Sequence, residues 1–151
     1  MTVRGTNGAD NISVANAGNA DQGRVWVNDG TVILFNTVGA ANFSTVSVQG
    51  RFGDDHFSVT PIGNVALTID GGDPTASDTV VVNVSNNTTF APTSSSSATV
   101  AVTGFALVTL TTIEGVTIGG NDGNLALNVQ TPAGAMTTTL TPGSTADAGT
   151  V

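Results

Sequence analysis

One twelve-residue phrase occurs twice in this chain. Residues 3–14 read VRGTNGADNISV, and residues 48–59 read VQGRFGDDHFSV. Both copies follow the pattern V-x-G-x-x-G-x-D-x-apolar-S-V, and Val48 stands 45 positions after Val3. Similarity at a fixed offset indicates a repeat architecture, in which each repeat is one supersecondary unit that stacks on its neighbours.

Short apolar runs separated by Gly, Asn and Asp recur along the chain, and no long window has the i, i+3, i+4, i+7 spacing of a helix. Such runs are typical of strands bounded by turns. The sequence therefore predicts an all-β fold. The expected strands are residues 12–14, 25–27, 32–35, 46–48, 57–59, 65–69, 80–84, 100–102, 107–110, 116–118, 125–129 and 137–140.

The strand candidates form two interleaved series, each with a step of about 22 residues, which suits one coil of a parallel β-solenoid (β-helix). A longer offset relates the first half of the series to the second. We therefore expect residues 1–140 to form a single β-solenoid made of two three-coil repeats, about 1–67 and 68–140. Polar residues at 83–98 predict a loop insertion, and residues 141–151 predict a flexible tail or the lead-in to a further repeat.

One segment favours a different all-β fold. Residues 25–35 read VWVNDGTVILF, in which Asp29 and Gly30 lie between alternating apolar residues. Asp-Gly in this context is a strong signal for an antiparallel hairpin. An antiparallel β-sandwich built of hairpins is therefore the alternative to the solenoid.

Charge limits the partners that this chain can have. It has 11 acidic residues against three Arg and no Lys, for a net charge of -8. Nucleic acids and anionic membranes bind through basic patches, so neither is an expected partner, whereas cations are. Cys is absent, which excludes disulfides, and no apolar run is long enough to insert in a membrane. Abundant Thr, Asn and Ser with little charge is typical of extracellular or cell-surface bacterial β-structure.

Residues 50–58 and 5–13 match the calcium-binding nonapeptide G-G-x-G-x-D-x-apolar-x except at its second glycine, where Arg51 and Thr6 stand. The chain resembles the RTX (hemolysin-type) calcium-binding repeat proteins and long repetitive bacterial surface proteins. The resemblance implies Ca²⁺ held by turn carbonyls and Asp carboxylates, the oxygen ligands that this ion prefers. It departs from the family in that the two matches are not in tandem. The candidate metal ligands in the matching and looser turns are Asp10, Asp54, Asp55, Asp73, Asp78 and Asp122.

A structural role for the same residues is the alternative, because Asp and Asn favour turns by bonding to their own backbone. If Phe57 points into the core, alternation also sends Asp55 inward and Asp54 away from the core. That arrangement fits a turn-stabilising Asp better than a pair of catalytic carboxylates.

Signals for an enzyme are weak. His56 is the single histidine, it stands where the first copy has Asn11, and no Ser/His/Asp set or nucleotide-binding loop is present. Trp26 fits a core or edge position better than a sugar-stacking platform. We expect a non-enzymatic extracellular structural or adhesive module, and Ca²⁺ is its candidate cofactor. The alternative is a carbohydrate-binding or polysaccharide-cleaving β-helix protein.

A solenoid has two open ends, and terminal repeats usually carry polar caps. This sequence contains no obvious cap. We therefore expect either neighbouring repeats of a longer chain or end-to-end self-association into filaments.

Overall fold

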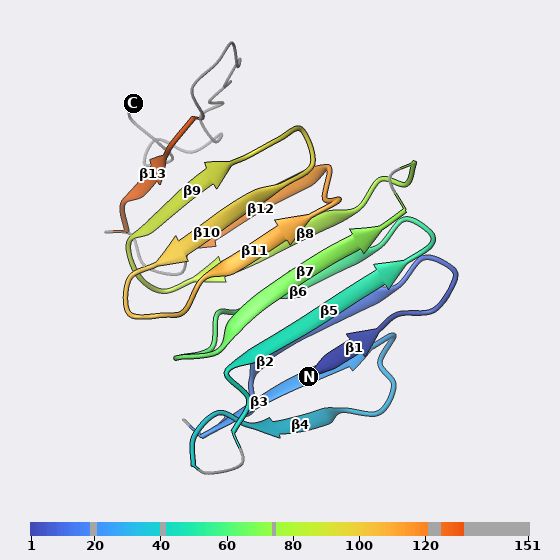
Figure 1. The fold of residues 1–151 in the computed structure, drawn as a ribbon, viewed down its shortest axis with the longest axis horizontal. Coiled ribbons are helices and arrows are strands. Elements are labelled where there is room, and N and C mark those ends of the chain that lie inside the picture. The colour runs from blue at the N-terminus through green and yellow to red at the C-terminus, as the bar shows by residue number, and fades with distance from the viewer. Residues whose placement is uncertain (19–20, 40–41, 74, 121–124, 132–151) are drawn as a thin grey trace.

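The computed structural model describes residues 1–18, 21–39, 42–73, 75–120 and 125–131. These residues contain strands and no helix, and they form two facing sheets (Figure 1). The seven-stranded sheet has the order β1 (Thr2–Arg4), β5 (Thr45–Arg51), β7 (Ala66–Gly72), β11 (Val108–Thr111), β10 (Ala98–Val102), β9 (Thr88–Pro92) and β13 (Leu127–Val129). The six-stranded sheet has the order β12 (Gly115–Gly120), β8 (Thr79–Val84), β6 (His56–Val59), β2 (Asn11–Asn16), β3 (Gln22–Val27) and β4 (Ile33–Asn36).

The centre of the molecule is a stack of parallel rungs, each made of one strand from each sheet. The rungs are β1–β2, β5–β6, β7–β8 and β11–β12, and they pair in this order in both sheets. Val3 pairs with Val48, and Ile12 pairs with Phe57. The duplicated phrase of the sequence is therefore two neighbouring rungs stacked in register.

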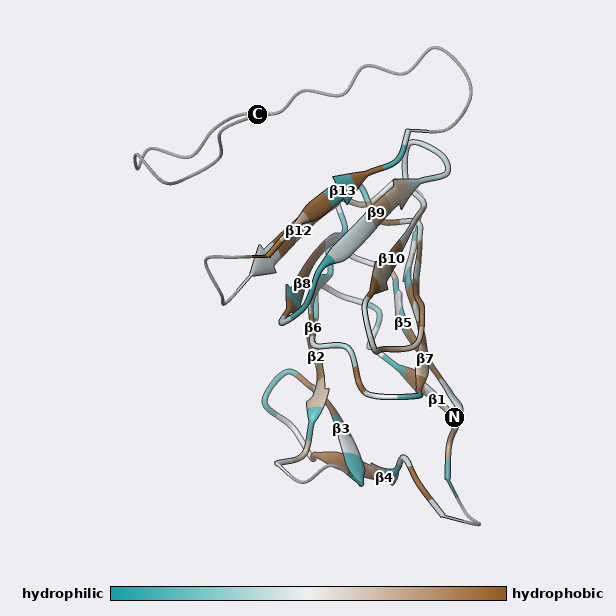
Figure 2. Ribbon diagram, turned by 90° about the vertical axis from the view of Figure 1, so that its left-hand side faces the viewer, coloured by the Kyte–Doolittle hydropathy of each residue, from teal (hydrophilic) through white to brown (hydrophobic). Residues whose placement is uncertain are grey.

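The two sheets face each other in Figure 2, and the core lies between them. It is built from alternating buried residues of the rungs. Strand β5 alternates buried and less buried positions, and Val46 and Val48 are its inward apolar residues. Phe57 is fully buried at the equivalent face of β6. Val, Ile and Leu suit this pleated, half-buried environment, which explains why the apolar runs of the sequence become strands.

The alternative hairpin signal is confirmed for residues 22–36. Strand β3 pairs antiparallel with both β2 and β4, so neither β3 nor β4 continues the parallel stack. Asn28 and Asp29 adopt φ angles of 49° and 55°, and the Gly30 N–H donates to the Val27 carbonyl at 2.9 Å. This tight primed turn reverses the chain at once, whereas a parallel connection needs a crossover of a dozen or more residues.

The predicted loop at residues 83–98 is wrong over its central part. Residues 88–92 form β9, which pairs antiparallel with β10, and β10 in turn pairs antiparallel with β11. Runs of Asn, Thr and Ser resemble a loop in the sequence. In the fold, Thr88 is buried and Phe90 packs against the core, and these contacts overcome the weak strand signal.

The all-β class is thus correct, and both sheets are mixed rather than purely parallel. The uniform step of about 22 residues fails wherever a hairpin intervenes between two rungs. The expected strand at 137–140 and the tail at 141–151 lie outside the described residues. Within the described ranges there is no helix that is long and apolar enough to cross a bilayer.

Candidate functional site: a ladder of buried carboxylates

Four acidic residues occupy the same place in the four rungs. Each stands immediately before the rung's second strand: Asp10 before β2, Asp55 before β6, Asp78 before β8 and Glu114 before β12. The three Asp side chains are at most 2% exposed, whereas Glu114 is exposed. We call these four residues the carboxylate ladder.

Each of the last three carboxylates of the ladder accepts a hydrogen bond from the backbone of the rung before it. Asp55 Oδ1 accepts from the Asp10 N–H at 2.8 Å, and Asp78 Oδ1 accepts from the Asp55 N–H at 2.7 Å. Glu114 Oε2 accepts from the Asp78 N–H at 2.9 Å. Charge-assisted bonds of this kind are stronger than neutral ones. The ladder therefore ties successive rungs together along one edge of the stack.

Glycines make the space for these carboxylates. A Cβ atom on Gly50 would lie closer than 3.0 Å to both Asp55 Oδ2 and the Gly71 carbonyl oxygen. A Cβ on Gly71 would meet Asp78 Oδ2 and the Thr112 carbonyl oxygen in the same way. The first glycine of the duplicated phrase is thus required by close packing, since none of these positions has an unusual φ angle.

The hydrogen bonding of the second carboxylate oxygen differs between the Asp residues of the ladder. Asp55 Oδ2 and Asp78 Oδ2 are buried without a hydrogen-bond partner. Asp10, in contrast, accepts from the Thr6 N–H at 2.5 Å and the Thr6 hydroxyl at 3.0 Å, and also from Asn28 Nδ2. Asn28 belongs to the β3–β4 turn, so the inserted hairpin completes the shell of Asp10.

Burial and mutual repulsion favour the protonated form in the middle of the ladder. Desolvation by burial, together with the charges of Asp78, Asp10 and Asp54, raises the pKa of Asp55 to about 6, although the Asp10 N–H acts in the opposite direction. Burial likewise raises the pKa of Asp78, with Glu114 as the nearest repelling charge. A protonated Oδ2 would supply the donor that these positions lack.

The structure separates the six predicted metal ligands into groups. Asp10, Asp55 and Asp78 lie together in the ladder, as described above. Asp54 is exposed, and its Oδ1 accepts from the Ser77 N–H of the next rung's turn at 3.0 Å. Asp73 Oδ1 accepts from the Thr75 N–H at 3.0 Å and from the Thr75 hydroxyl, and these bonds lower the pKa of Asp73. Asp122 lies outside the described residues.

The prediction that Asp55 points inward and Asp54 points away from the core is confirmed, since Asp55 is buried with Phe57 and Asp54 is exposed. The ladder residues do not fit the RTX calcium site well, because one oxygen of each already binds a backbone amide. No group of three or more His, Cys, Asp or Glu within the described ranges is arranged to hold a metal ion. Support for calcium therefore rests on the sequence resemblance.

The two groups considered for an enzyme, His56 and Trp26, lie on different strands of the six-stranded sheet, β6 and β3, with β2 between them. His56 is exposed, and its Nδ1 is 2.9 Å from the Thr79 hydroxyl. Trp26 is half-buried, with the Arg24 guanidinium 4.9 Å from its ring centroid, which is a cation–π contact.

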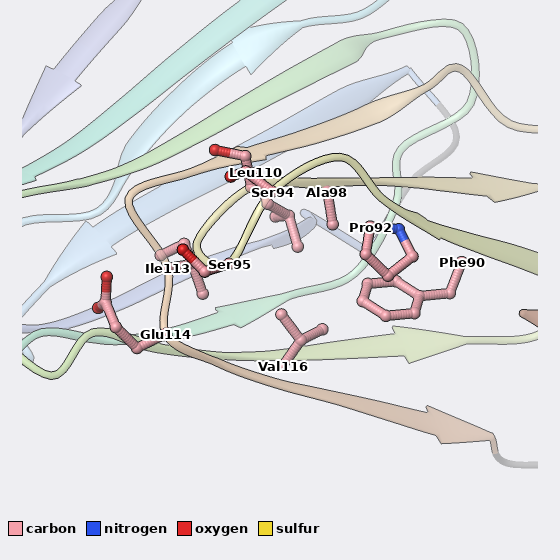
Figure 3. Close-up of a pocket in the computed structure, with 10 residues that line it drawn as sticks. Phe90, Pro92, Ser94, Ser95, Ala98, Leu110, Ile113, Glu114 and Val116 are labelled. Atoms are coloured by element: carbon pink, nitrogen blue, oxygen red, sulfur yellow. The ribbon is translucent and has the colours of Figure 1, made fainter. Parts of the chain in front are cut away.

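A cavity of about 270 Å³ lies between the β9–β10 hairpin and the segment from β11 to β12 (Figure 3). Its lining is mainly apolar residues and serines, and Glu114 is its single acidic residue. Neither His56 nor Trp26 lines it. The cavity therefore offers one carboxylate and no partner for acid–base chemistry.

Two residues of the site, Glu114 and Asn28, were not predicted from the sequence. Glu114 has no glycine-rich turn before it, because the fourth rung replaces that turn with Thr112 and Ile113. The sequence feature that could have identified Glu114 is its position two residues before Val116, because Asp10 likewise stands two residues before Ile12. Asn28 gave no signal, because its contact with the ladder depends on how the hairpin folds back.

Comparison of the chain with protein-family models, with curated proteins and with solved structures finds no match in any of the three. The class of this protein is thus defined by its own fold and site: an all-β repeat structure with a buried carboxylate ladder.

Proposed function

We propose that this chain is a non-enzymatic structural or adhesive repeat module of an extracellular or cell-surface protein. Its framework is a short parallel β-solenoid whose rungs are interrupted by two antiparallel hairpins. The observation that carries the proposal is the ladder: the acidic residues best suited to chemistry are buried and bind the backbone of neighbouring rungs. Groups used in this way stabilise a stack and are not free to act on a substrate.

Composition supports the extracellular location. The chain has no Cys and no Lys, few charges overall, and many Thr, Asn and Ser residues on short strands and turns. The outward positions of the rungs are small and polar, as in Ser13 and Ser58 of the six-stranded sheet. A surface of this kind suits an exposed spacer or an adhesive face.

A polysaccharide degradation assay tests the non-enzymatic role. The protein is incubated with neutral and acidic polysaccharides, and new reducing or unsaturated ends are measured. We expect none above the level of a heat-denatured sample. Product formation that disappears in His56→Ala would overturn the proposal in favour of the polysaccharide-cleaving alternative.

Binding of the same polysaccharides without cleavage would support the adhesive role and the carbohydrate-binding alternative together. Trp26 is the residue to test in that case, because it is the single tryptophan and is half-buried beside Arg24. Loss of binding in Trp26→Ala would identify it as a sugar-stacking platform.

Calcium binding is the second candidate, and it rests on the resemblance of the turns around Asp54 and Asp73 to the calcium-binding nonapeptide. Calcium that binds the folded state alone raises the melting temperature by mass action. The expected result under this candidate is a rise in Tm with added Ca²⁺ that EDTA reverses and that Asp54→Asn or Asp73→Asn reduces. An unchanged Tm in excess Ca²⁺ would remove calcium from the proposed function.

A further inference from the structure

At each end of the molecule, one of the two sheets extends beyond the last strand of the other. The six-stranded sheet continues beyond β2 with β3 and β4, whereas the seven-stranded sheet stops at β1. Figure 2 shows β3 and β4 lying beyond β1 at this end. At the other end the seven-stranded sheet continues beyond β11 with β10, β9 and β13, whereas the six-stranded sheet stops at β12. Opposite sheets therefore project at opposite ends.

The β4 end is apolar. Among the residues that the structure describes, five of the eight exposed large hydrophobic side chains belong to β4 and its flanks: Val32, Ile33, Leu34, Val38 and Phe43. We call these five residues the β4 patch. Ile33 lies on the same face of the sheet as the buried Val25, but the facing sheet ends at β1, and Ile33 is therefore 40% exposed. Terminal repeats normally present a polar outer face, and this end does not.

The edge of β4 is covered at its last residue, where the Phe43 N–H donates to the Asn36 carbonyl at 2.9 Å, but β4 carries none of the residues that usually prevent strand pairing. Natural edge strands carry Lys, other charges or Pro that block a partner. Residues 30–50 contain no charged residue and no Pro. Leu34 pairs with Arg24 of β3, and among residues 1–18, 21–39, 42–73, 75–120 and 125–131 none beyond β4 bonds to the Leu34 backbone.

The described strands of the opposite end are likewise uncharged and largely apolar. Neither β12 nor residues 125–131 contain a charged side chain, and Leu127 is 51% exposed. Ile118, Leu125 and Leu127 line a cavity of about 170 Å³ between β12 and β13. The net charge of -8 is instead carried largely by turns along the sides of the stack, such as those holding Asp54 and Asp73. The strands β4, β12 and β13 of two copies can therefore meet without bringing charged side chains of these strands together.

We propose that the β4 end of one copy docks on the β12–β13 end of a second copy, head to tail. In this arrangement β4 extends the six-stranded sheet of the next copy beyond its β12, and the β4 patch is buried. The contact is heterologous, so each copy keeps one free end of each kind and the assembly grows as a linear filament. This inference rests on the proposed structural role and names the surfaces that serve it.

Two variants, one at each end, test the docking. Leu34→Lys and Leu127→Lys each place a charge on one end, and both leucines are more than half exposed, at 58% and 51%. Phe52→Lys is the matched control, because Phe52 is 56% exposed and lies in the turn between β5 and β6, away from both ends. Unchanged unfolding midpoints establish that the variants fold.

Sedimentation velocity over a hundredfold range of concentration gives the readout. We expect the average mass of the wild-type protein and of Phe52→Lys to rise with concentration, and each end variant alone to remain monomeric. A mixture of the two end variants keeps one intact end of each kind, so it should reach twice the monomer mass and no more.

Three results would overturn the docking proposal. Wild-type protein that stays monomeric throughout excludes a second copy as the occupant of this patch. Self-association that persists in Leu127→Lys and is lost in Leu34→Lys indicates a symmetric β4–β4 dimer instead. Equal loss in Phe52→Lys indicates a nonspecific charge effect. None of these results bears on catalysis or on the ladder, so the proposed function would be judged separately by its own assay.

Discussion

The first rung and the middle rungs of the ladder use the same residue in different surroundings. Asp10 has partners for both carboxylate oxygens, because Thr6 of its own turn and Asn28 of the inserted hairpin donate to it. Asp55 and Asp78 each have one oxygen bound to an amide and one buried without a partner. The comparison teaches that stacking supplies one backbone donor to each middle carboxylate, whereas Asp10, which has no rung before it, takes its donors from its own turn and from the inserted hairpin.

The largest expected effect comes from filling the space beside a middle carboxylate. Gly50→Ala places a Cβ closer than 3.0 Å to Asp55 Oδ2 and to the Gly71 carbonyl oxygen. The Asp55 side chain is buried and the Gly71 oxygen belongs to the backbone, so neither atom can move away easily. We expect a loss of about 3–5 kcal/mol in the free energy of unfolding, or failure to fold. Urea denaturation followed by circular dichroism measures it.

Gly8→Ala is the control for this change. A Cβ on Gly8 meets nothing within 4 Å, so its free energy of unfolding should stay close to that of the wild type. A loss in Gly8→Ala as large as in Gly50→Ala would show that the glycine effect is unrelated to the ladder.

The second largest expected change in the free energy of unfolding has opposite signs for substitutions of Asp10 and of Asp55. Asp10→Asn turns an oxygen that accepts from Thr6 or Asn28 into an amide donor, and it should lose about 1–3 kcal/mol of stability at neutral pH. Asp55→Asn keeps the acceptor for the Asp10 N–H and places a donor at the unpartnered oxygen, beside the Gly71 carbonyl. It should gain about 1–2 kcal/mol. Urea denaturation of both variants under the same conditions measures the two changes. A loss of stability in both variants would contradict the difference between the surroundings of Asp10 and Asp55.

A smaller effect is expected from pH alone. The fold raises the pKa of Asp55 to about 6 from an ordinary value of 3.8, so the folded state binds this proton more tightly than the unfolded state does. The free energy of unfolding contributed by this group therefore rises as the pH falls through about 6 and is complete below about 4. Burial of Asp78 acts in the same direction.

Thermal melts between neutral pH and about pH 5 measure this dependence, a window that stays above the range where most other carboxylates titrate. The wild-type Tm should increase on acidification, and the increase should shrink in Asp55→Asn. A Tm that instead falls steadily from neutral pH would mean that Asp55 is ionised and paired in the fold.

The smallest expected effect is at the exposed end of the ladder. Glu114→Gln keeps an oxygen that can accept from the Asp78 N–H, and the side chain is solvent-accessible. We expect a change of about 0.5 kcal/mol or less, as is usual for surface substitutions. A loss comparable with that of Asp10→Asn, measured in the same denaturation series, would show that the ladder depends on charge at its last rung.

Much of the rung structure could be predicted from the sequence. The apolar alternation around Val48 and Phe57 gave the strands and the inward direction of Asp55, and the duplicated phrase gave two stacked rungs. The hairpins broke the expected period, since a uniform step says nothing about where the chain turns back. The antiparallel signal at Asn28 to Gly30 was readable, but its consequence for the topology required knowing that β3 pairs with β2.

The site was harder to read than the fold. A sequence shows acidic residues in turns, and calcium ligands and backbone-binding carboxylates produce the same pattern. What separates them is which donors face each oxygen, and these come from residues far away in the chain, such as the Asp10 N–H for Asp55. Asp54 and Asp73, which are candidate calcium ligands in the sequence like Asp55, contact backbone amides of the turns instead.

Strands β1 and β5 pair in register although a whole hairpin separates them in the chain. The pairing of two rungs therefore does not depend on the length of the segment inserted between them, provided that the segment begins and ends at the same positions of the stack. Genes for such chains can lengthen by inserting excursions of any size, and the repeat then becomes hard to recognise while the framework stays intact. The turn at Asn28 and Asp29 is, by the same logic, a suitable place to graft a foreign peptide for display, as long as the contact of Asn28 with Asp10 is kept.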